Sequence, residues 1–287
     1  MGARIKKGAA AAVALISATA AVVIGLGSSS SAATVPSLQA FGIAGGGTLM
    51  LSFKTDTPEQ NDWVRRVTGL VGDTALIGID FRVQDGKLYG VGNYGGIYTI
   101  GIPSTAAVKV SQLGVALYGT KFGVDFNPAA NRLRVISDNG QNLSHDVVGG
   151  VTTEQTTLTT PPATGPTKGV TAAAYTNNDL DPTTNTALFD IATVTDQVVI
   201  QSPPGNGFLV ATGNLGFDAG LDAGFDIYSD LTNGKTTSAT AFAALTPAGG
   251  LQTLYSIDLL TGAATIAGMT GVFPLDVSDV ALALDTM

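Results

Sequence analysis

A pattern of four short strands recurs along this chain about every fifty residues, a period typical of stacked structural repeats. Phe81, Phe126, Tyr175 and Ile227 hold equivalent positions in the first strand of each unit, at intervals of 45, 49 and 52 residues. Each strand is rich in Val, Ile, Tyr, Phe or Thr and is bounded by Gly, Pro, Asn or Asp. Repeating units of four strands predict the blades of a β-propeller.

The two ends of the chain hold incomplete units. Residues 38–45, 48–53 and 63–70 provide three strands without a first strand, whereas 280–284 is one apolar strand without partners. Because an open sheet edge is a template for aggregation, we expect the last strand to supply the missing innermost strand of the first blade. The sequence therefore predicts an all-β, five-bladed β-propeller closed by its C-terminal strand. An irregular β-sandwich of the same strands is the alternative.

The first 33 residues are typical of a secretory signal peptide. Arg4, Lys6 and Lys7 precede an apolar stretch at 9–26, and small residues follow it, as signal cleavage requires. An uncleaved membrane anchor is the alternative, because the stretch approaches spanning length. We expect residues 34–287 to form a single propeller domain with no membrane span. The mature protein would be secreted, either extracellular or in the cell envelope.

Composition excludes several classes of function. The chain has no cysteine, so disulfides, thiol nucleophiles and zinc–thiolate sites are absent. The net charge is −8, and removing the three cations of the leader makes it −11. Such an acidic surface repels phosphate backbones, so nucleic acid is not an expected partner. We expect no cofactor, although the acidic composition leaves binding of Ca²⁺ or another hard cation open.

A repeated aspartate is the strongest chemical signal. Asp80, Asp125 and Asp226 occupy the same place on three innermost strands, whereas the third unit has Ala174 there. Two carboxylates about 4 Å apart repel by roughly 4 kcal/mol at an effective dielectric constant near 20, so convergence needs a cation or a bound proton. The three residues could brace their own blades through backbone N–H groups, share a metal ion, or act as acids in glycoside cleavage.

Other polar residues are weaker candidates. Asn127 and Asn177 are added to the three aspartates as candidate ligand-binding residues. The segment 177–185 places oxygen ligands at alternate positions with Asp190 twelfth from Asp179, but it has Thr at the sixth position, where a calcium loop requires Gly. We therefore expect a turn between two strands. No Gly-x-Ser-x-Gly elbow accompanies the only histidine, His145, so no catalytic residue is assigned.

Longer runs of the sequence resemble a known family. They are residues 76–82 (LIGIDFR), 86–90 (GKLYG), 122–128 (FGVDFNP), 132–143 (RLRVISDNGQNL), 173–177 (AAYTN) and 201–204 (QSPP). Over about 38–284 the chain is similar to the bacterial family called domain of unknown function 4394. The resemblance implies an exported bacterial protein with a propeller-like fold, and it implies no activity.

These observations favour a non-catalytic, exported binding module. Its loops or its channel mouth would present a surface to an extracellular glycan or an envelope protein, since rigid scaffolds commonly carry binding loops. The alternative is a glycoside hydrolase or lactonase that uses the carboxylates of Asp80, Asp125 and Asp226 in the central channel, with or without calcium. A purely structural envelope component is a third hypothesis. The sequence does not determine the oligomeric state.

Overall fold

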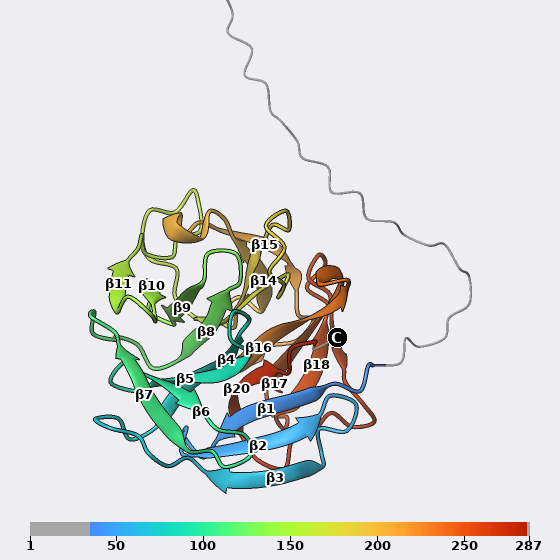
Figure 1. The fold of residues 1–287 in the computed structure, drawn as a ribbon. Helices are drawn as coiled ribbons and strands as arrows, with labels where there is room; N and C mark the ends of the chain where they lie inside the picture. The colour runs from blue at the N-terminus through green and yellow to red at the C-terminus, as the bar shows by residue number, and fades with distance from the viewer. Residues whose placement is uncertain (1–34, 286–287) are drawn as a thin grey trace, which may run out of the picture. The chain divides into compact units, whose positions relative to one another are not determined.

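The computed structural model describes residues 35–285, which form five sheets of four antiparallel strands each (Figure 1). Blade 1 consists of β20 (Val277–Leu282), β1 (Gln39–Ala44), β2 (Leu49–Lys54) and β3 (Asn61–Arg66). Blade 2 consists of β4 (Leu76–Arg82), β5 (Lys87–Gly92), β6 (Gly96–Ile100) and β7 (Ala107–Gln112). Blade 3 consists of β8 (Phe122–Asn127), β9 (Arg132–Ser137), β10 (Asn142–Asp146) and β11 (Val151–Glu154).

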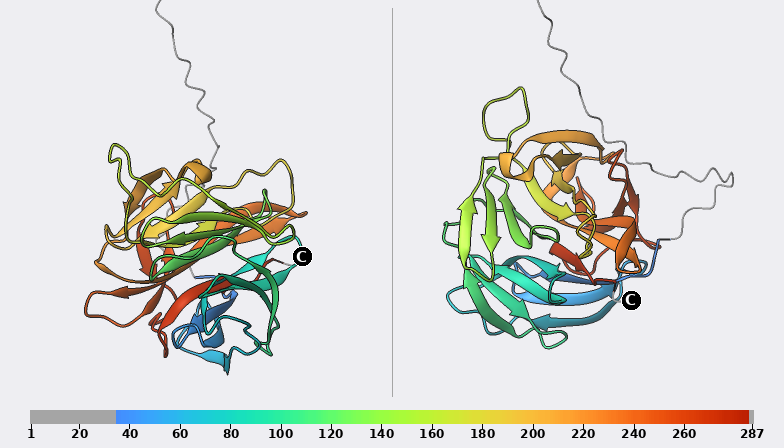
Figure 2. Two further views of the ribbon diagram at one scale, coloured as in Figure 1. Left: turned by 90° about the vertical axis from the view of Figure 1, so that its left-hand side faces the viewer. Right: turned by 45° about the horizontal axis from the view of Figure 1, so that its top comes forward.

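Blade 4 consists of β12 (Val170–Tyr175), β13 (Leu188–Ala192), β14 (Gln197–Gln201) and β15 (Leu209–Asn214), with a short 3₁₀ turn η1 (Pro204–Asn206) before the last strand. Blade 5 consists of β16 (Ala219–Thr232), β17 (Lys235–Pro247), β18 (Thr253–Ile257) and β19 (Ala264–Ile266). The five sheets follow one another round a ring, as two further views show (Figure 2). This arrangement confirms the five-bladed propeller and excludes the sandwich.

The C-terminal strand closes the ring. In blade 1, β20 pairs antiparallel with β1, and Ala281 lies opposite Phe41 (Figure 1). Closure by the tail is therefore confirmed, although β20 begins at Val277, three residues before the expected start at 280. The predicted signal peptide lies outside the described residues. Within 35–285, no helix has the length and apolarity needed to cross a bilayer.

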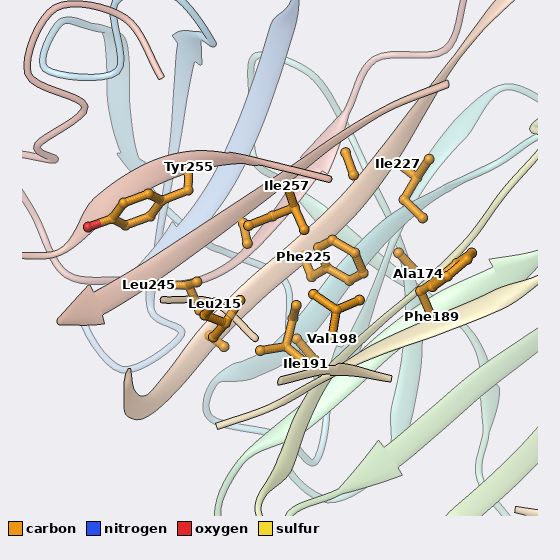
Figure 3. Close-up of a cluster of buried hydrophobic side chains, with 14 residues drawn as sticks. Ala174, Phe189, Ile191, Val198, Leu215, Phe225, Ile227, Leu245, Tyr255 and Ile257 are labelled. Carbon is orange, nitrogen blue, oxygen red and sulfur yellow. The ribbon is translucent and has the colours of Figure 1, made fainter. Parts of the chain in front are cut away.

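The apolar core lies between neighbouring blades. Between blades 4 and 5, Phe225 and Ile227 of β16 pack with Ala174, Phe189 and Val198 of blade 4 (Figure 3). Side chains of this size each contribute about 1.5–3 kcal/mol when fully buried. Both faces of a blade are buried in this way, which explains why the strands read as apolar on both sides.

Glycines allow the innermost strands to approach one another closely. A Cβ on Gly123 of β8 would lie 2.6 Å from the backbone N of Ala173 in β12, which is too close for any side chain. A Cβ on Gly78 of β4 would lie 2.3 Å from Cγ2 of Val124, again on the next innermost strand. The first residue of the repeated Gly-x-Asp pattern thus sets the narrow spacing of the ring.

The hairpin of blade 5 is longer than the sequence pattern predicts. The sequence pattern predicts short strands in every unit, whereas β16 and β17 contain 14 and 13 residues. The extension is tied down at Leu231, whose N–H donates to Asp285 at 2.8 Å.

Candidate functional site

The three repeated aspartates connect neighbouring blades. Asp80 Oδ2 accepts the N–H of Phe126 at 2.7 Å, and Asp125 Oδ1 accepts the N–H of Tyr175 at 3.1 Å. Asp226 Oδ2 likewise accepts an N–H of β20 at 2.6 Å. In each case the donor belongs to the innermost strand of the next blade. The carboxylates therefore brace the joints between blades, whereas the sequence suggested that each braces its own blade.

A fourth carboxylate serves the joint between blades 1 and 2. Asp279 of β20 accepts the N–H of Ile79 at 2.8 Å, although it stands two residues before the place of the other aspartates. The sequence analysis did not find Asp279, because the expected C-terminal strand began one residue later, at Val280. The joint between blades 4 and 5 has no such carboxylate, and Ala174 is packed in the apolar cluster of Figure 3 instead.

The carboxylates also converge. Asp80, Asp125 and Asp226 each place one oxygen so that the three atoms lie within 4.8 Å of one another. Burial, joined by the repulsion of neighbouring carboxylates, raises the pKa of Asp80 and Asp125 well above the usual value, and burial raises the pKa of Asp226 to about 6. The cluster therefore retains protons under mildly acidic conditions.

The same three oxygens test the calcium hypothesis. Oxygens that bind one Ca²⁺ at about 2.4 Å lie at most about 4.8 Å apart, so the spacing fits a shared cation. However, Asp80, Asp125 and Asp226 are only 4%, 3% and 2% exposed, and each already accepts backbone N–H bonds. Calcium binding here stays a prediction.

A separate cavity of about 570 Å³ opens where the innermost strands begin; we call it the mouth cavity. It is lined by Gly46, Leu76, Ile77, Thr120, Lys121, Phe122, Thr171, Gly220, Leu221, Asp222, Ala223, Thr246, Gln252, Asp276, Val277 and Ser278. The buried aspartates are not among these residues. Asp226 lies four residues after Asp222 on the same strand, which corresponds to roughly 13 Å of extended chain.

β-Bulges shape the lining of the mouth cavity. In blades 1, 2 and 4 the innermost strand has one extra residue opposite its partner strand, namely Ser278, Ile77 and Thr171. In blade 5 the three residues 220–222 oppose the single residue 246. All of these bulged residues line the cavity. Bulges redirect side chains and are common beside functional sites, so the ring is locally reshaped at this face.

Charged groups in the mouth cavity come from three blades. Lys121 precedes β8 of blade 3, and its ammonium forms an ion pair with Asp222 in the bulge of blade 5. The pair therefore spans the beginning of β12, which lies between these two blades in the ring. Asp276, just before β20, adds an exposed carboxylate to the lining. The sequence reasoning missed all three residues, because no motif links them.

The two predicted asparagines lie in turns. Asn127 Oδ1 accepts the N–H of Ala130 at 2.7 Å and so stabilises the turn between β8 and β9. Asn177 has a positive φ of 66°, and its side-chain amide donates to the carbonyl of Asn185 in the connection between β12 and β13. Neither residue lines the mouth cavity. Their role in ligand binding stays a prediction.

The segment 177–185 forms the expected connection between two strands of blade 4. Asp179 Oδ2 accepts both the N–H and the hydroxyl of Thr236, at 2.9 and 2.6 Å, on the long hairpin of blade 5. The carboxylate of Asp179 thus holds two blades together. Asp190, the twelfth residue counted from Asp179, lies inside β13 and is fully buried.

A buried polar cluster between blades 3 and 4 escaped the sequence reasoning. Arg134 of β9 donates to the hydroxyl of Tyr175 at 3.2 Å and to Oδ1 of Asn142 at 2.5 Å. Both carboxylate oxygens of Asp190 are buried without a hydrogen-bond partner. Burial raises the pKa of Asp190 well above its usual value, against the opposing charge of Arg134. The burial of Asp190 therefore favours its protonated form.

Comparisons with known proteins agree with the fold. Residues 49–281 match the family described as "Domain of unknown function (DUF4394)". No curated protein matches the chain in sequence.

Among solved structures, the chain is similar to a protein of unknown function from Bacteroides thetaiotaomicron VPI-5482, with a TM-score of 0.51 and 15% identity over 88% of this chain and 68% of that chain. The chain is also similar to Myxococcus xanthus glutaminyl cyclase, with a TM-score of 0.45 and 12% identity over 78% of this chain and 98% of that one. At such identities the likeness to the Bacteroides protein shows a shared fold and nothing about function.

Proposed function

This chain belongs to the DUF4394 family, and we propose that it is a non-catalytic binding module, exported from the cell, that holds an extracellular glycan or envelope protein at its mouth cavity. The observation that carries the proposal is the set of bulges in four of the five innermost strands, each of which turns residues into one cavity. A volume of about 570 Å³ is typical of ligand pockets, and concave sites on rigid scaffolds are where binding residues concentrate.

The burial of Asp80, Asp125 and Asp226 supports binding over catalysis. A general acid or nucleophile must reach the substrate within hydrogen-bond distance. Asp80, Asp125 and Asp226 are almost completely buried and do not line the mouth cavity, so a ligand held there does not touch them. Their bonds to the next blade support a role in the stability of the ring.

Blocking the cavity tests the proposal. We expect the wild-type protein to bind members of a glycan array, and Ser278→Trp to abolish that binding because an indole would occupy the mouth. Thr120→Trp blocks from another blade, which guards against misfolding of one variant. Ser104→Trp, an exposed serine in the β6–β7 connection, is the matched control. Equal binding by all four proteins would refute a site at the mouth.

A hydrolase is the second candidate, favoured by the convergence of three carboxylate oxygens with raised pKa values. Its test is a panel of chromogenic glycosides and lactones, with and without CaCl₂. Turnover that disappears in the Asp80→Asn/Asp125→Asn double variant would establish the hydrolase and overturn the binding-only proposal. If the residues only brace the blades, the double variant lowers the melting temperature and changes no binding.

A further inference from the structure

We propose that the ligand of the mouth cavity carries a primary ammonium group, which replaces the ammonium of Lys121 beside Asp222, and that this ligand is an oligosaccharide of amino sugars. The inference rests on the proposed function and specifies the ligand of the same site. It follows from the charges, the hydrogen bonds and the exposed rim of the cavity.

The Lys121–Asp222 ion pair shows what the cavity accepts. The two side chains come from blades 3 and 5 and meet across the mouth, so a primary ammonium already occupies the place beside the carboxylate. The side chains of Lys121 and Asp222 are 32% and 50% exposed, and ion pairs with such exposure are weak. A ligand ammonium can therefore exchange with that of Lys121 at a cost of about fivefold in affinity or less.

The lining favours a cation. It contains one basic residue, Lys121, against two acidic residues, Asp222 and Asp276. Once the ion pair opens, both carboxylates are available to a ligand while Lys121 can turn to solvent. The chain as a whole carries a net charge of −8, which attracts cations over longer distances.

Three uncharged polar side chains of the cavity, those of Thr120, Gln252 and Ser278, are already engaged within the protein. The hydroxyl of Thr120 donates to Asp138 at 2.6 Å, and that of Ser278 contacts the carbonyl of Ile43 at 3.4 Å. The side-chain amide of Gln252 both donates to and accepts from the backbone of Val277. Charge, more than these hydrogen bonds, therefore selects the ligand.

The rim of the cavity suits a sugar. Leu221 lines the cavity and is 48% exposed, whereas Tyr118, which is 46% exposed, lies near the cavity without being one of its lining residues. Tyr118 stands two residues before Thr120, so their Cα atoms lie no more than about 7.6 Å apart. An exposed tyrosine offers a flat apolar surface with a polar tip, which matches the apolar face and hydroxyl rim of a pyranose ring.

Isothermal titration calorimetry tests the inference with three ligands. They are a glucosamine tetrasaccharide, the fully N-acetylated tetrasaccharide of the same length, and a tri-lysine peptide. We expect the wild-type protein to bind the glucosamine tetrasaccharide and to bind the N-acetylated one at least tenfold more weakly. Asp222→Asn and Asp276→Asn should each weaken binding of the glucosamine tetrasaccharide about tenfold, and Lys121→Gln should strengthen it a few-fold. Asp218→Asn, at an exposed acid just before β16 that does not line the cavity, should leave it unchanged.

The outcomes separate this inference from the proposed function. Equal binding of both tetrasaccharides, with loss in Ser278→Trp, would refute the ammonium specificity and leave the binding module standing. Binding of tri-lysine alone would refute the sugar as the carrier of the ammonium. No effect of Asp222→Asn or Asp276→Asn would refute the carboxylate site. Absence of binding by any glycan or envelope protein would remove the proposed function itself.

Discussion

Substitution of Asp226 by Asn measures how much the ionisation of one buried carboxylate lowers the free energy of unfolding. Burial raises the pKa of Asp226 from 3.8 to about 6, so the folded protein holds this proton more tightly than the unfolded chain. The associated stability is complete below pH 3.8 and is lost as the pH rises through 6. At 1.36 kcal/mol for each pH unit between the two pKa values, the loss is about 3 kcal/mol.

The assay is urea denaturation of the wild-type and Asp226→Asn proteins at pH 4 and pH 7. Trp63 is the only tryptophan and lies 6.0 Å from Phe41, measured between ring centroids, so its fluorescence reports the integrity of blade 1. Because asparagine carries no charge at either pH, we expect the substitution to destabilise the protein by about 2 kcal/mol more at pH 4 than at pH 7, since pH 4 lies just above the unfolded pKa of 3.8.

Asp146→Asn provides a control of opposite sign. Backbone N–H groups of Gly149 and Val148 lower the pKa of this exposed carboxylate, so its contribution is present at neutral pH and is lost as the pH falls. The substitution should therefore cost more at pH 7 than at acid pH. If Asp226→Asn changes the free energy of unfolding equally at pH 4 and pH 7, the buried carboxylate carries no such cost and the reasoning fails.

Three further predictions concern the ring. Gly123→Ala should lower the free energy of unfolding by about 1–3 kcal/mol in urea denaturation, since its Cβ would meet the backbone of β12, whereas Gly165→Ala, with open space around its Cβ, should not. Deletion of residues 277–287 should abolish cooperative thermal unfolding and give aggregates in size-exclusion chromatography, because β1 would lose its pairing with β20. A monodisperse product that resists heat as well as the intact protein would contradict closure of the ring by the C-terminal strand. Burial lowers the pKa of His145, so the stability of the wild-type protein should fall as the pH drops below 6.5. The melting temperature of His145→Gln should fall less between pH 6.5 and 5. If both proteins show the same dependence of melting temperature on pH, His145 is excluded as the cause.

The fold followed from patterns that are local in the chain. The Gly-x-Asp sequence marks an innermost strand because glycine permits a close approach of the neighbouring innermost strand, as Gly78 and Gly123 show. The incomplete units at the two ends predicted the pairing of β1 with β20, because a ring leaves no open edge. Such features depend on strand propensity and on the period of the repeat, both of which a single sequence contains.

The site was decided by tertiary structure. The register between strands of different blades decides which backbone N–H each aspartate accepts. The same register brings Asp279 to the joint between blades 1 and 2, although this residue is offset by two positions from the other aspartates. The meeting of Lys121 with Asp222 depends on the same register and on a three-residue bulge. Strand periodicity contains no information on the alignment of one blade with the next, because packing across the ring sets that alignment. The chain therefore determined its five blades by itself, whereas the ring determined which of their side chains meet.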